Sequence, residues 1–205
     1  MNGRAGAPGA MVVIISGPSG VGKDTIIDAL RRRHDRPDLG FIITSTTRRP
    51  RPGEVDGVHY HFVSPARFRS MRRRGELLEA AEVHGNWYGT RRRDVLETLD
   101  GGCHAVLKID VQGARTVKAA VPDALLIFIV PPSLEALFQR LRARATETAD
   151  ELEIRQRDAA IELARAGDYD HVVVNETDQV EQTADRIVEI IDEERARHAG
   201  RRVEL

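Results

Sequence analysis

The sequence predicts an α/β fold in which helices flank a parallel β-sheet, and three observations support this class. Continuous apolar runs, typical of strands buried on both faces of a sheet, recur along the chain. Segments with apolar residues at helical spacing lie between these runs, and a glycine-rich turn joins the first run to the first such segment. Strands that alternate with helices in this way build a parallel sheet.

This alternation assigns the elements of the core in order. The expected strands are Met11–Ser16, Ala105–Ile109, Leu125–Val130 and His171–Val174. The expected helices are Asp24–Arg33, Arg93–Leu99, Gln112–Val121, Leu134–Arg144, Glu151–Arg165 and Gln179–Arg197. Residues 41–92 interrupt the alternation with proline and glycine among short strand-like pieces. We therefore expect residues 44–92 to form an insertion with a small sheet of its own.

The remaining boundaries follow from composition. A length of 205 residues fits one domain, which we expect to span residues 11–198, with its core in 11–43 and 93–198. Residues 1–10 are small, glycine-rich and without periodicity, so they should form a flexible arm. Residues 199–205 should form a C-terminal tail.

Composition also excludes several classes of protein. Hydrophobic residues make up 41% and charged residues 31%, as in a soluble globular protein. The single cysteine, Cys103, excludes an intramolecular disulfide and fits a reducing, cytoplasmic setting. No apolar run approaches the about 18 residues of a membrane helix, and a net charge of −1 excludes a globally basic nucleic-acid binder. We thus expect neither a membrane nor a nucleic acid as partner, and a homo-oligomer stays open.

A phosphate-binding loop follows the first strand. The segment GPSGVGK, residues 17–23, lies between a buried strand and a helix, which is the context that a P-loop requires. Backbone N–H groups of such a loop surround a phosphate, and the lysine reaches the terminal phosphates. We expect ATP to be bound by Gly17, Pro18, Ser19, Gly20, Val21, Gly22, Lys23, Asp24 and Thr25.

The residue after the lysine departs from the P-loop pattern. Asp24 stands where a serine or threonine normally helps to hold Mg²⁺, and Thr25 comes next. A carboxylate is a competent Mg²⁺ ligand, so Asp24 and Thr25 are the candidate metal residues. The alternative is that Asp24 only favours the positive end of the helix dipole.

An arginine-rich turn suggests a second phosphate site. Arg48, Arg49 and Arg51 lie in a proline-bracketed turn, and a stiff loop of arginines suits a bidentate grip on a phosphate monoester. Tyr60 and Tyr88 could add hydroxyl donors. Taken alone, the same arginines could equally form a solvated surface.

Three segments together resemble the guanylate kinase family. They are TSTTRRPRPGEVDGVHYHF from Thr44, LLEAAEVHGNWYGT from Leu77 and KIDVQGA from Lys108, and the resemblance runs from about Val12 to Glu193. It implies a P-loop nucleoside monophosphate kinase with an inserted GMP-binding subdomain and a helical lid, which transfers the γ-phosphate of ATP to GMP with Mg²⁺. It also implies that the GMP phosphate is held by Arg48, Arg51, Tyr60 and Tyr88, and that guanine is read by Thr44, Glu79, Thr90 and Asp110.

The chemistry of guanine agrees with this assignment. Guanine presents N1–H and the 2-amino group as donors, and the Glu79 carboxylate can accept from both. Adenine lacks these donors and would leave the carboxylate unpaired, which is how polar pockets discriminate strongly.

A third arginine cluster resembles the mobile lid of the family, at about residues 140–158, with alanine at positions 143 and 145 instead of the usual glycines. Phosphoryl transfer needs charge stabilisation more than bond chemistry. The resemblance therefore implies catalytic roles for Lys23, Arg48, Asp110, Arg140, Arg144 and Arg155.

One further departure lies beside the site. The family usually has an acidic residue two positions before Asp110, and this chain has Lys108. Lys108 could pair with Asp24, which would keep the local charge balanced, or it could point outward.

Other functions remain as alternatives. A kinase that acts on ribose 1,5-bisphosphate also carries Asp after the P-loop lysine, but it should lack the combination of Glu79 and Asp110. A non-catalytic guanylate-kinase-like binding module would typically have a degraded P-loop. An RNA binder would need an aromatic platform beyond Trp87 and scattered phenylalanines.

Overall fold

The computed structural model describes all residues except 1–5, 84, 144–148, 198–199 and 201. Its centre is a five-stranded sheet in the order β2-β7-β1-β8-β9, and all neighbouring strands are parallel. The strands are β1 (Val12–Ser16), β2 (Leu39–Phe41), β7 (His104–Lys108), β8 (Leu125–Val130) and β9 (His171–Val174). The predicted fold class is confirmed. The short edge strand β2 was not predicted.

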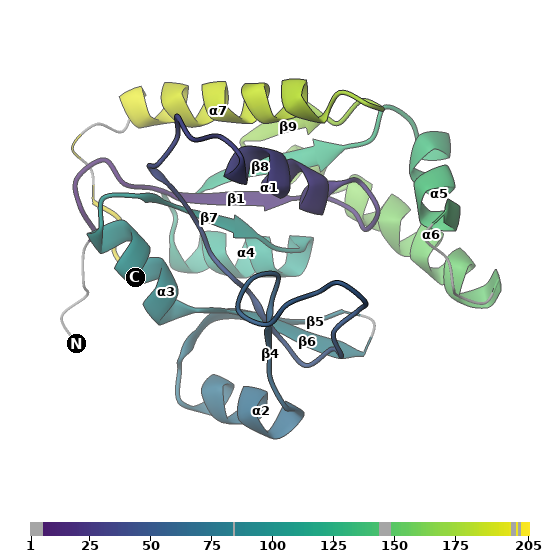
Figure 1. The fold of residues 1–205 in the computed structure, drawn as a ribbon, viewed down its shortest axis with the longest axis horizontal. Coiled ribbons are helices and arrows are strands. Elements are labelled where there is room, and N and C mark those ends of the chain that lie inside the picture. The colour runs from purple at the N-terminus through teal and green to yellow at the C-terminus, as the bar shows by residue number, and fades with distance from the viewer. Residues whose placement is uncertain (1–5, 84, 144–148, 198–199, 201) are drawn as a thin grey trace.

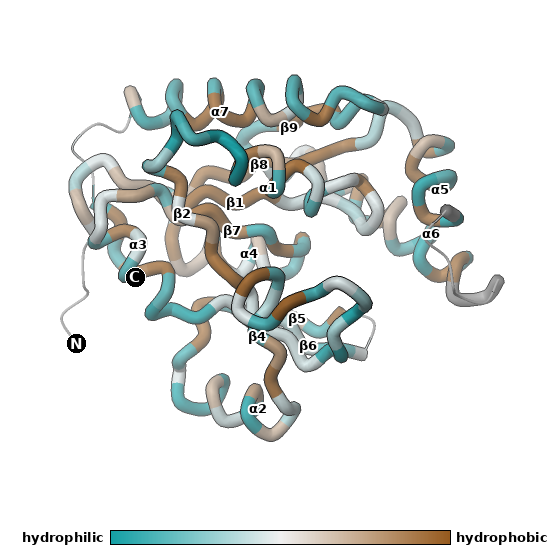
Figure 2. The backbone as a smooth tube through the Cα atoms, in the orientation of Figure 1, coloured by the Kyte–Doolittle hydropathy of each residue, from teal (hydrophilic) through white to brown (hydrophobic). Residues whose placement is uncertain are grey.

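Helices cover both faces of this sheet (Figure 1). One face carries α1 (Lys23–Arg31) and α7 (Val180–Arg197), and the other carries α3 (Arg92–Asp100) and α4 (Val111–Ala120). Alternate residues of β1 point into two separate cores: Val13 and Ile15 pack towards α1 and α7, whereas Val12 and Ile14 pack towards α3 and α4. Figure 2 shows the same division, because α7 turns apolar residues to the sheet and polar residues outward.

The insertion has a small sheet of its own, in the order β4-β3-β6-β5. Its strands are β3 (Ser45–Thr46), β4 (His61–Phe62), β5 (Leu77–Val83) and β6 (Asn86–Arg91). A helix that was not predicted, α2 (Pro65–Arg73), packs Phe68 and Met71 against it. Ser64 caps this helix by accepting a hydrogen bond from the Arg67 N–H at 3.2 Å.

Two helices beyond β8 stand at one end of the sheet. They are α5 (Leu134–Ala143) and α6 (Ala149–Leu163), and a short 3₁₀ turn, η1 (Ala166–Asp168), leads from them to β9. Because α5 and α6 follow the carboxyl end of β8, they lie on the same side as the phosphate loop (Figure 1). No helix within the described ranges is both long and apolar enough to cross a bilayer.

The part of the expected N-terminal arm that is described contacts the core. The Gly6 N–H donates to the Val203 carbonyl at 3.0 Å, and the Ala7 N–H donates to the Leu99 carbonyl at 3.0 Å. Ala10 is buried. Backbone hydrogen bonds thus hold the start of residues 6–10 against the core. Such bonds leave no pattern of apolar side chains, so the sequence does not predict this contact.

Candidate active site

The glycine-rich loop between β1 and α1 requires glycine for reasons of space and backbone conformation. Gly22 precedes α1 with φ at 103°, a left-handed conformation, and a Cβ there would lie 2.5 Å from Asn175 Nδ2. A Cβ on Gly17 would collide with the Ile129 carbonyl of β8. At Gly17 and Gly22 the loop therefore lies so close to neighbouring residues that there is no room for a Cβ atom.

Lys23 begins α1 and folds back under this loop. Its Nζ donates to the Pro18 carbonyl at 2.9 Å and to the Gly17 carbonyl. Burial lowers the pKa of Lys23, while the carboxylates of Glu162 and Asp24 act in the opposite direction. The ammonium group is thus held at the loop by carbonyl oxygens, with acidic groups nearby.

Residues from α5 and α6 reach the loop. The Ser19 N–H donates to Glu162 Oε2 at 3.1 Å, and Arg155 Nη2 donates to Ser19 Oγ at 3.0 Å. Arg140 Nη1 donates to the Val21 carbonyl at 3.2 Å. Arg140 and Arg155 therefore lie at the loop, and Arg144 falls outside the described residues.

The four residues expected to read guanine lie near the junction of the insertion and the core. Thr44, Glu79 and Thr90 are buried, with Glu79 only 4% exposed. Thr90 Oγ1 donates to Glu79 Oε1 at 2.8 Å. Asp110 caps α4 and accepts from the Gln112 and Gly113 N–H groups at 2.7 and 2.9 Å.

Glu79 also faces the start of α4. A Cβ added to Gly113 would lie 2.9 Å from Glu79 Oε2, so the glycine allows the carboxylate to approach the helix. Burial raises the pKa of the Glu79 carboxyl to about 7, and nearby Asp110 adds to the rise, whereas the hydrogen bond from Thr90 opposes it. The charged form of a buried carboxylate is poorly solvated, so hydrogen-bond donors that reach it stabilise it strongly.

Arg48 and the two tyrosines meet in the insertion. Arg48 Nη2 donates to Glu54 Oε1 at 2.7 Å, and its guanidinium lies 5.4 Å from the centroid of the Tyr60 ring. The Tyr60 and Tyr88 rings make an edge contact at 6.1 Å between centroids. Arg51 is exposed, and its backbone N–H donates to Glu54 Oε2 at 2.7 Å. Glu54 therefore orients Arg48 and closes the turn that carries Arg51.

Lys108 joins the two halves of the site. Its Nζ contacts Asp24 Oδ1 on α1 and lies 3.4 Å from Tyr60 Oη in the insertion. The pairing with Asp24, which the sequence left open, is thus present. A cavity of about 200 Å³ is lined by Asp24, Thr44, Glu54, Tyr60 and Lys108, so it contains residues expected for both nucleotides.

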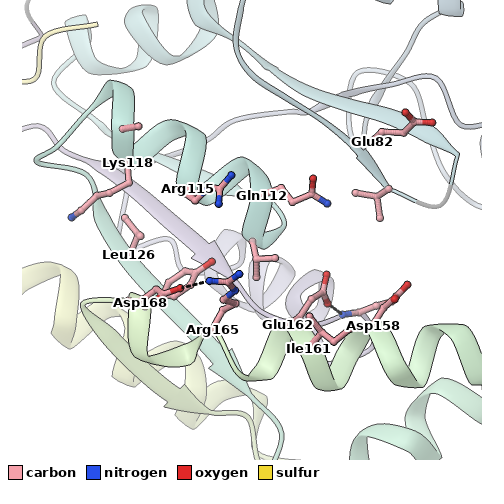
Figure 3. A pocket seen from close by; sticks show the side chains of 15 residues that line it. Glu82, Gln112, Arg115, Lys118, Leu126, Asp158, Ile161, Glu162, Arg165 and Asp168 are labelled. Carbon is pink, nitrogen blue, oxygen red and sulfur yellow. Dashed lines mark hydrogen bonds and ion pairs between the residues drawn. The ribbon is translucent and has the colours of Figure 1, made fainter.

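A larger cavity of about 690 Å³ lies between α4 and α6 (Figure 3). Ser19 is the one candidate residue among those that line it. Gln112 and Arg115 project from α4, opposite Asp158 and Glu162 on α6. Two of the candidate GMP residues, Thr44 and Tyr60, line the smaller cavity, and none lines the larger one.

The acidic groups do not form a ready-made metal cage. Among the described residues, no group of three or more His, Cys, Asp or Glu side chains is placed to hold a metal ion. Mg²⁺ commonly keeps several waters and binds one or two carboxylates together with substrate phosphates. A carboxylate has about four acceptor positions, so the ion pair with Lys108 leaves Asp24 chemically competent as such a ligand. The donor set fits a metal ion that is carried by a nucleotide.

Two residues of the site were missed by sequence reasoning. Glu54 lies inside the arginine-rich segment, six residues after Arg48, and its role could have been suspected from the need to orient a guanidinium. Glu162 lies 143 residues from Ser19, and no local pattern connects them.

The comparisons with known proteins agree with one another. The family model described as guanylate kinase matches residues 9–194. The guanylate kinase of Gloeobacter violaceus is 51% identical over 172 residues, which cover 84% of this chain and 83% of that protein. The guanylate kinase of Mycobacterium bovis is 48% identical over 174 residues, 83% of each chain. The crystal structure of guanylate kinase from Anaplasma phagocytophilum superposes with a TM-score of 0.76 at 32% identity, covering 93% of this chain and 88% of the other.

Proposed function

The chain belongs to the guanylate kinase family, and from this premise we propose that it transfers the γ-phosphoryl group of ATP to GMP, giving ADP and GDP. The observation that carries the assignment is the buried Glu79 carboxylate, which lies beside Thr90 and Asp110 in a chain that also has an intact phosphate loop. A buried carboxylate has acceptor positions beyond the one that Thr90 fills, and guanine offers two adjacent N–H donors that suit them.

ATP binds at the loop between β1 and α1. The backbone N–H groups of the loop, which all of its residues except Pro18 provide, and the start of α1 surround its phosphates, with help from the helix dipole. Lys23 leaves the Gly17 and Pro18 carbonyls and turns to the β- and γ-phosphates. Burial disfavours the charged form of Lys23 and so lowers its pKa. The negative phosphates of ATP would stabilise that charged form.

GMP binds between the insertion and the core. Arg48, Arg51, Tyr60 and Tyr88 hold its phosphate, and Glu54 keeps the Arg48 guanidinium in a fixed orientation. Fixing the guanidinium before the ligand binds lowers the entropy lost in binding.

The guanine base enters the pocket of Thr44, Glu79, Thr90 and Asp110. Glu79 accepts from N1–H and the 2-amino group, and the Thr90 hydroxyl holds the carboxylate in place. Thr44 and Asp110 provide further polar groups to the base. Asp110 is held in place because it caps α4.

Transfer itself is a matter of position and charge. The acceptor oxygen of GMP attacks the γ-phosphorus in line, and the bond to the leaving oxygen of ADP breaks. Lys23, Arg48, Arg140 and Arg155 stabilise the negative charge that spreads over the phosphoryl oxygens, and we assign the same role to Arg144. When bound, Mg²⁺ would neutralise part of this charge. Asp24 and Thr25 are the residues of this chain that would hold it, since they follow Lys23 directly at the phosphate loop.

The test is a product analysis with ATP, Mg²⁺ and a choice of acceptors. GMP should give ADP and GDP in equal amounts, whereas AMP, UMP and ribose 1,5-bisphosphate should give little ADP. Ribose 1,5-bisphosphate has no N–H donors for Glu79 and would leave the buried carboxylate with the Thr90 hydroxyl but no donor from the substrate. ADP formation with that sugar and not with GMP would favour the alternative kinase. Absence of turnover with every acceptor would favour a non-catalytic binding module.

A further inference from the structure

Lys108 is a basic residue at the centre of the site that the proposed function leaves unused. It is the last residue of β7, and its side chain is 20% exposed. The strand places its ammonium group between α1, which carries Asp24, and the insertion, which carries Tyr60. One cation therefore touches an element of the ATP site and an element of the GMP site.

The contact with Tyr60 has a direction. A lysine ammonium has three donors and no acceptor, so the Tyr60 oxygen must accept in the contact with Lys108 at 3.4 Å. The tyrosine proton is then turned away from Lys108. The Tyr60 ring also contacts two cations, because Lys108 Nζ lies 4.9 Å from its centroid and the Arg48 guanidinium lies 5.4 Å from it.

Asp24 fixes the lysine in turn. The carboxylate accepts from Lys108 Nζ, so the ammonium is anchored to α1 on one side while it donates to Tyr60 on the other. The pair is also neutral as a whole, so Asp24 does not add net negative charge where phosphates bind. Hydrogen bonds in such a chain polarise one another, which makes the last O–H a better donor.

We propose that Lys108, anchored by Asp24, is a positioning residue that orients the Tyr60 hydroxyl towards the phosphate of GMP. The inference rests on the proposed function, because it takes Tyr60 as a ligand of that phosphate. It assigns Lys108 to recognition of the phosphate and not of the base.

The test measures binding of GMP and of guanosine by calorimetry, without ATP and without metal. Lys108→Met keeps the apolar stem and removes the ammonium. The dissociation constant for GMP should rise about fivefold, the equivalent of one hydrogen bond, and that for guanosine should stay unchanged. A variant with a damaged fold would instead weaken both. Lys108→Arg retains donors and should recover most of the affinity for GMP.

A double-mutant cycle with Tyr60→Phe then connects the two residues. If Lys108 acts through the tyrosine hydroxyl, adding Lys108→Met to Tyr60→Phe should change the GMP dissociation constant by less than about twofold. Lys118→Met is the matched control, because Lys118 lies on α4 and bonds the Ala124 carbonyl and Asp170. This control should bind GMP as the wild type does.

The outcomes distinguish a failure of the proposed function from a failure of the role assigned to Lys108. A wild-type protein that does not bind GMP would contradict the proposed function itself. Normal GMP binding by Lys108→Met, equal weakening for guanosine, or additive effects of the Lys108 and Tyr60 substitutions would each overturn the role of Lys108.

Discussion

Glu162 on α6 accepts a hydrogen bond from the Ser19 N–H of the phosphate loop at 3.1 Å. The contact joins α6 to the loop, and it places a carboxylate on a backbone donor that we propose for a nucleotide phosphate. On that proposal, ATP displaces an anionic group of the protein when it binds.

The first prediction concerns this contact. In Glu162→Gln the acceptor is neutral and its hydrogen bond is weaker, since charge-assisted bonds are roughly twice as strong as neutral ones. ATP should bind about two- to fivefold more tightly, because a weaker competitor is displaced and repulsion is lost. Calorimetric titration with ATP tests this, with Asp158→Asn on the same helix as control. Weaker binding by Glu162→Gln would mean that the carboxylate supports the site rather than competing with the phosphate.

Lys23 provides the second prediction. Lys23→Met removes a charge that is directed at the phosphates and keeps the apolar part of the side chain. Turnover with ATP and GMP should fall about a hundredfold or more, as when one donor to a transition-state oxygen is removed. The melting temperature should change little, because the lost bonds are to two loop carbonyls. Steady-state kinetics and a melting curve, measured on the wild type and on Lys23→Met, test this prediction. Substantial turnover of the variant would contradict the assignment of the loop as a phosphate-binding loop.

The third prediction uses the raised pKa of Glu79. In the free protein this pKa is about 7 because the carboxyl is buried, and the N–H donors of guanine should lower it by stabilising the charged form. GMP binding near pH 6 should therefore release protons, and the affinity should fall as pH decreases below 7. Calorimetry in buffers of different ionisation enthalpy measures the release. Glu79→Gln is the control. If this variant released as many protons on binding GMP as the wild type does, the protons would come from another group.

The same shift affects folding stability in a definite direction. The folded-state pKa of Glu79, about 7, is above the ordinary glutamate pKa of 4.5. Its contribution to stability is thus fully present below pH 4.5 and is lost as pH rises through 7. Glu79→Gln should therefore flatten the decrease in the free energy of unfolding between these pH values, as measured by urea denaturation.

The fourth prediction is closure around both nucleotides. The insertion and the helices α5 and α6 stand on the two sides of the phosphate loop (Figure 1), and transfer requires water to be excluded from the γ-phosphoryl group. Small-angle scattering should give a smaller radius of gyration with GMP and a non-hydrolysable ATP analogue than without ligands. Identical profiles would argue against closure.

The sequence predicted the core of the fold because its strands are continuous apolar runs, and β1, β7 and β8 are indeed buried on both faces, whereas the edge strand β9 exposes Val172 and Val174. Runs such as Leu125–Val130 and His171–Val174 have the bounds that the structure shows. The edge strand β2 escaped prediction because its three residues, Leu39–Phe41, include a glycine and follow a proline-containing turn. The helix Pro65–Arg73 was missed among the irregular pieces of the insertion, although Ser64 and Pro65 are a recognisable start signal.

The site was predictable where a motif is continuous and less so where distant segments meet. Lys23 and the glycines of the loop lie in one segment, so their proximity follows from the sequence. Asp24 and Lys108 are 84 residues apart, and their pairing depends on β1 and β7 being neighbours in the sheet. Side chains that act through tertiary contacts of this kind leave no periodic signal.

The most direct test of the account is the ratio of kcat/KM for GMP to that for AMP, in the wild type and in Glu79→Gln. The wild type should prefer GMP by about a thousandfold or more, because adenine brings no donors to the buried carboxylate and is therefore strongly disfavoured. In Glu79→Gln one carboxylate oxygen is replaced by an NH2 group that cannot accept a hydrogen bond, so the ratio should fall at least about tenfold while the melting temperature is retained. A wild type without preference for GMP, or an unchanged ratio in the variant, would contradict the claim that Glu79 selects guanine.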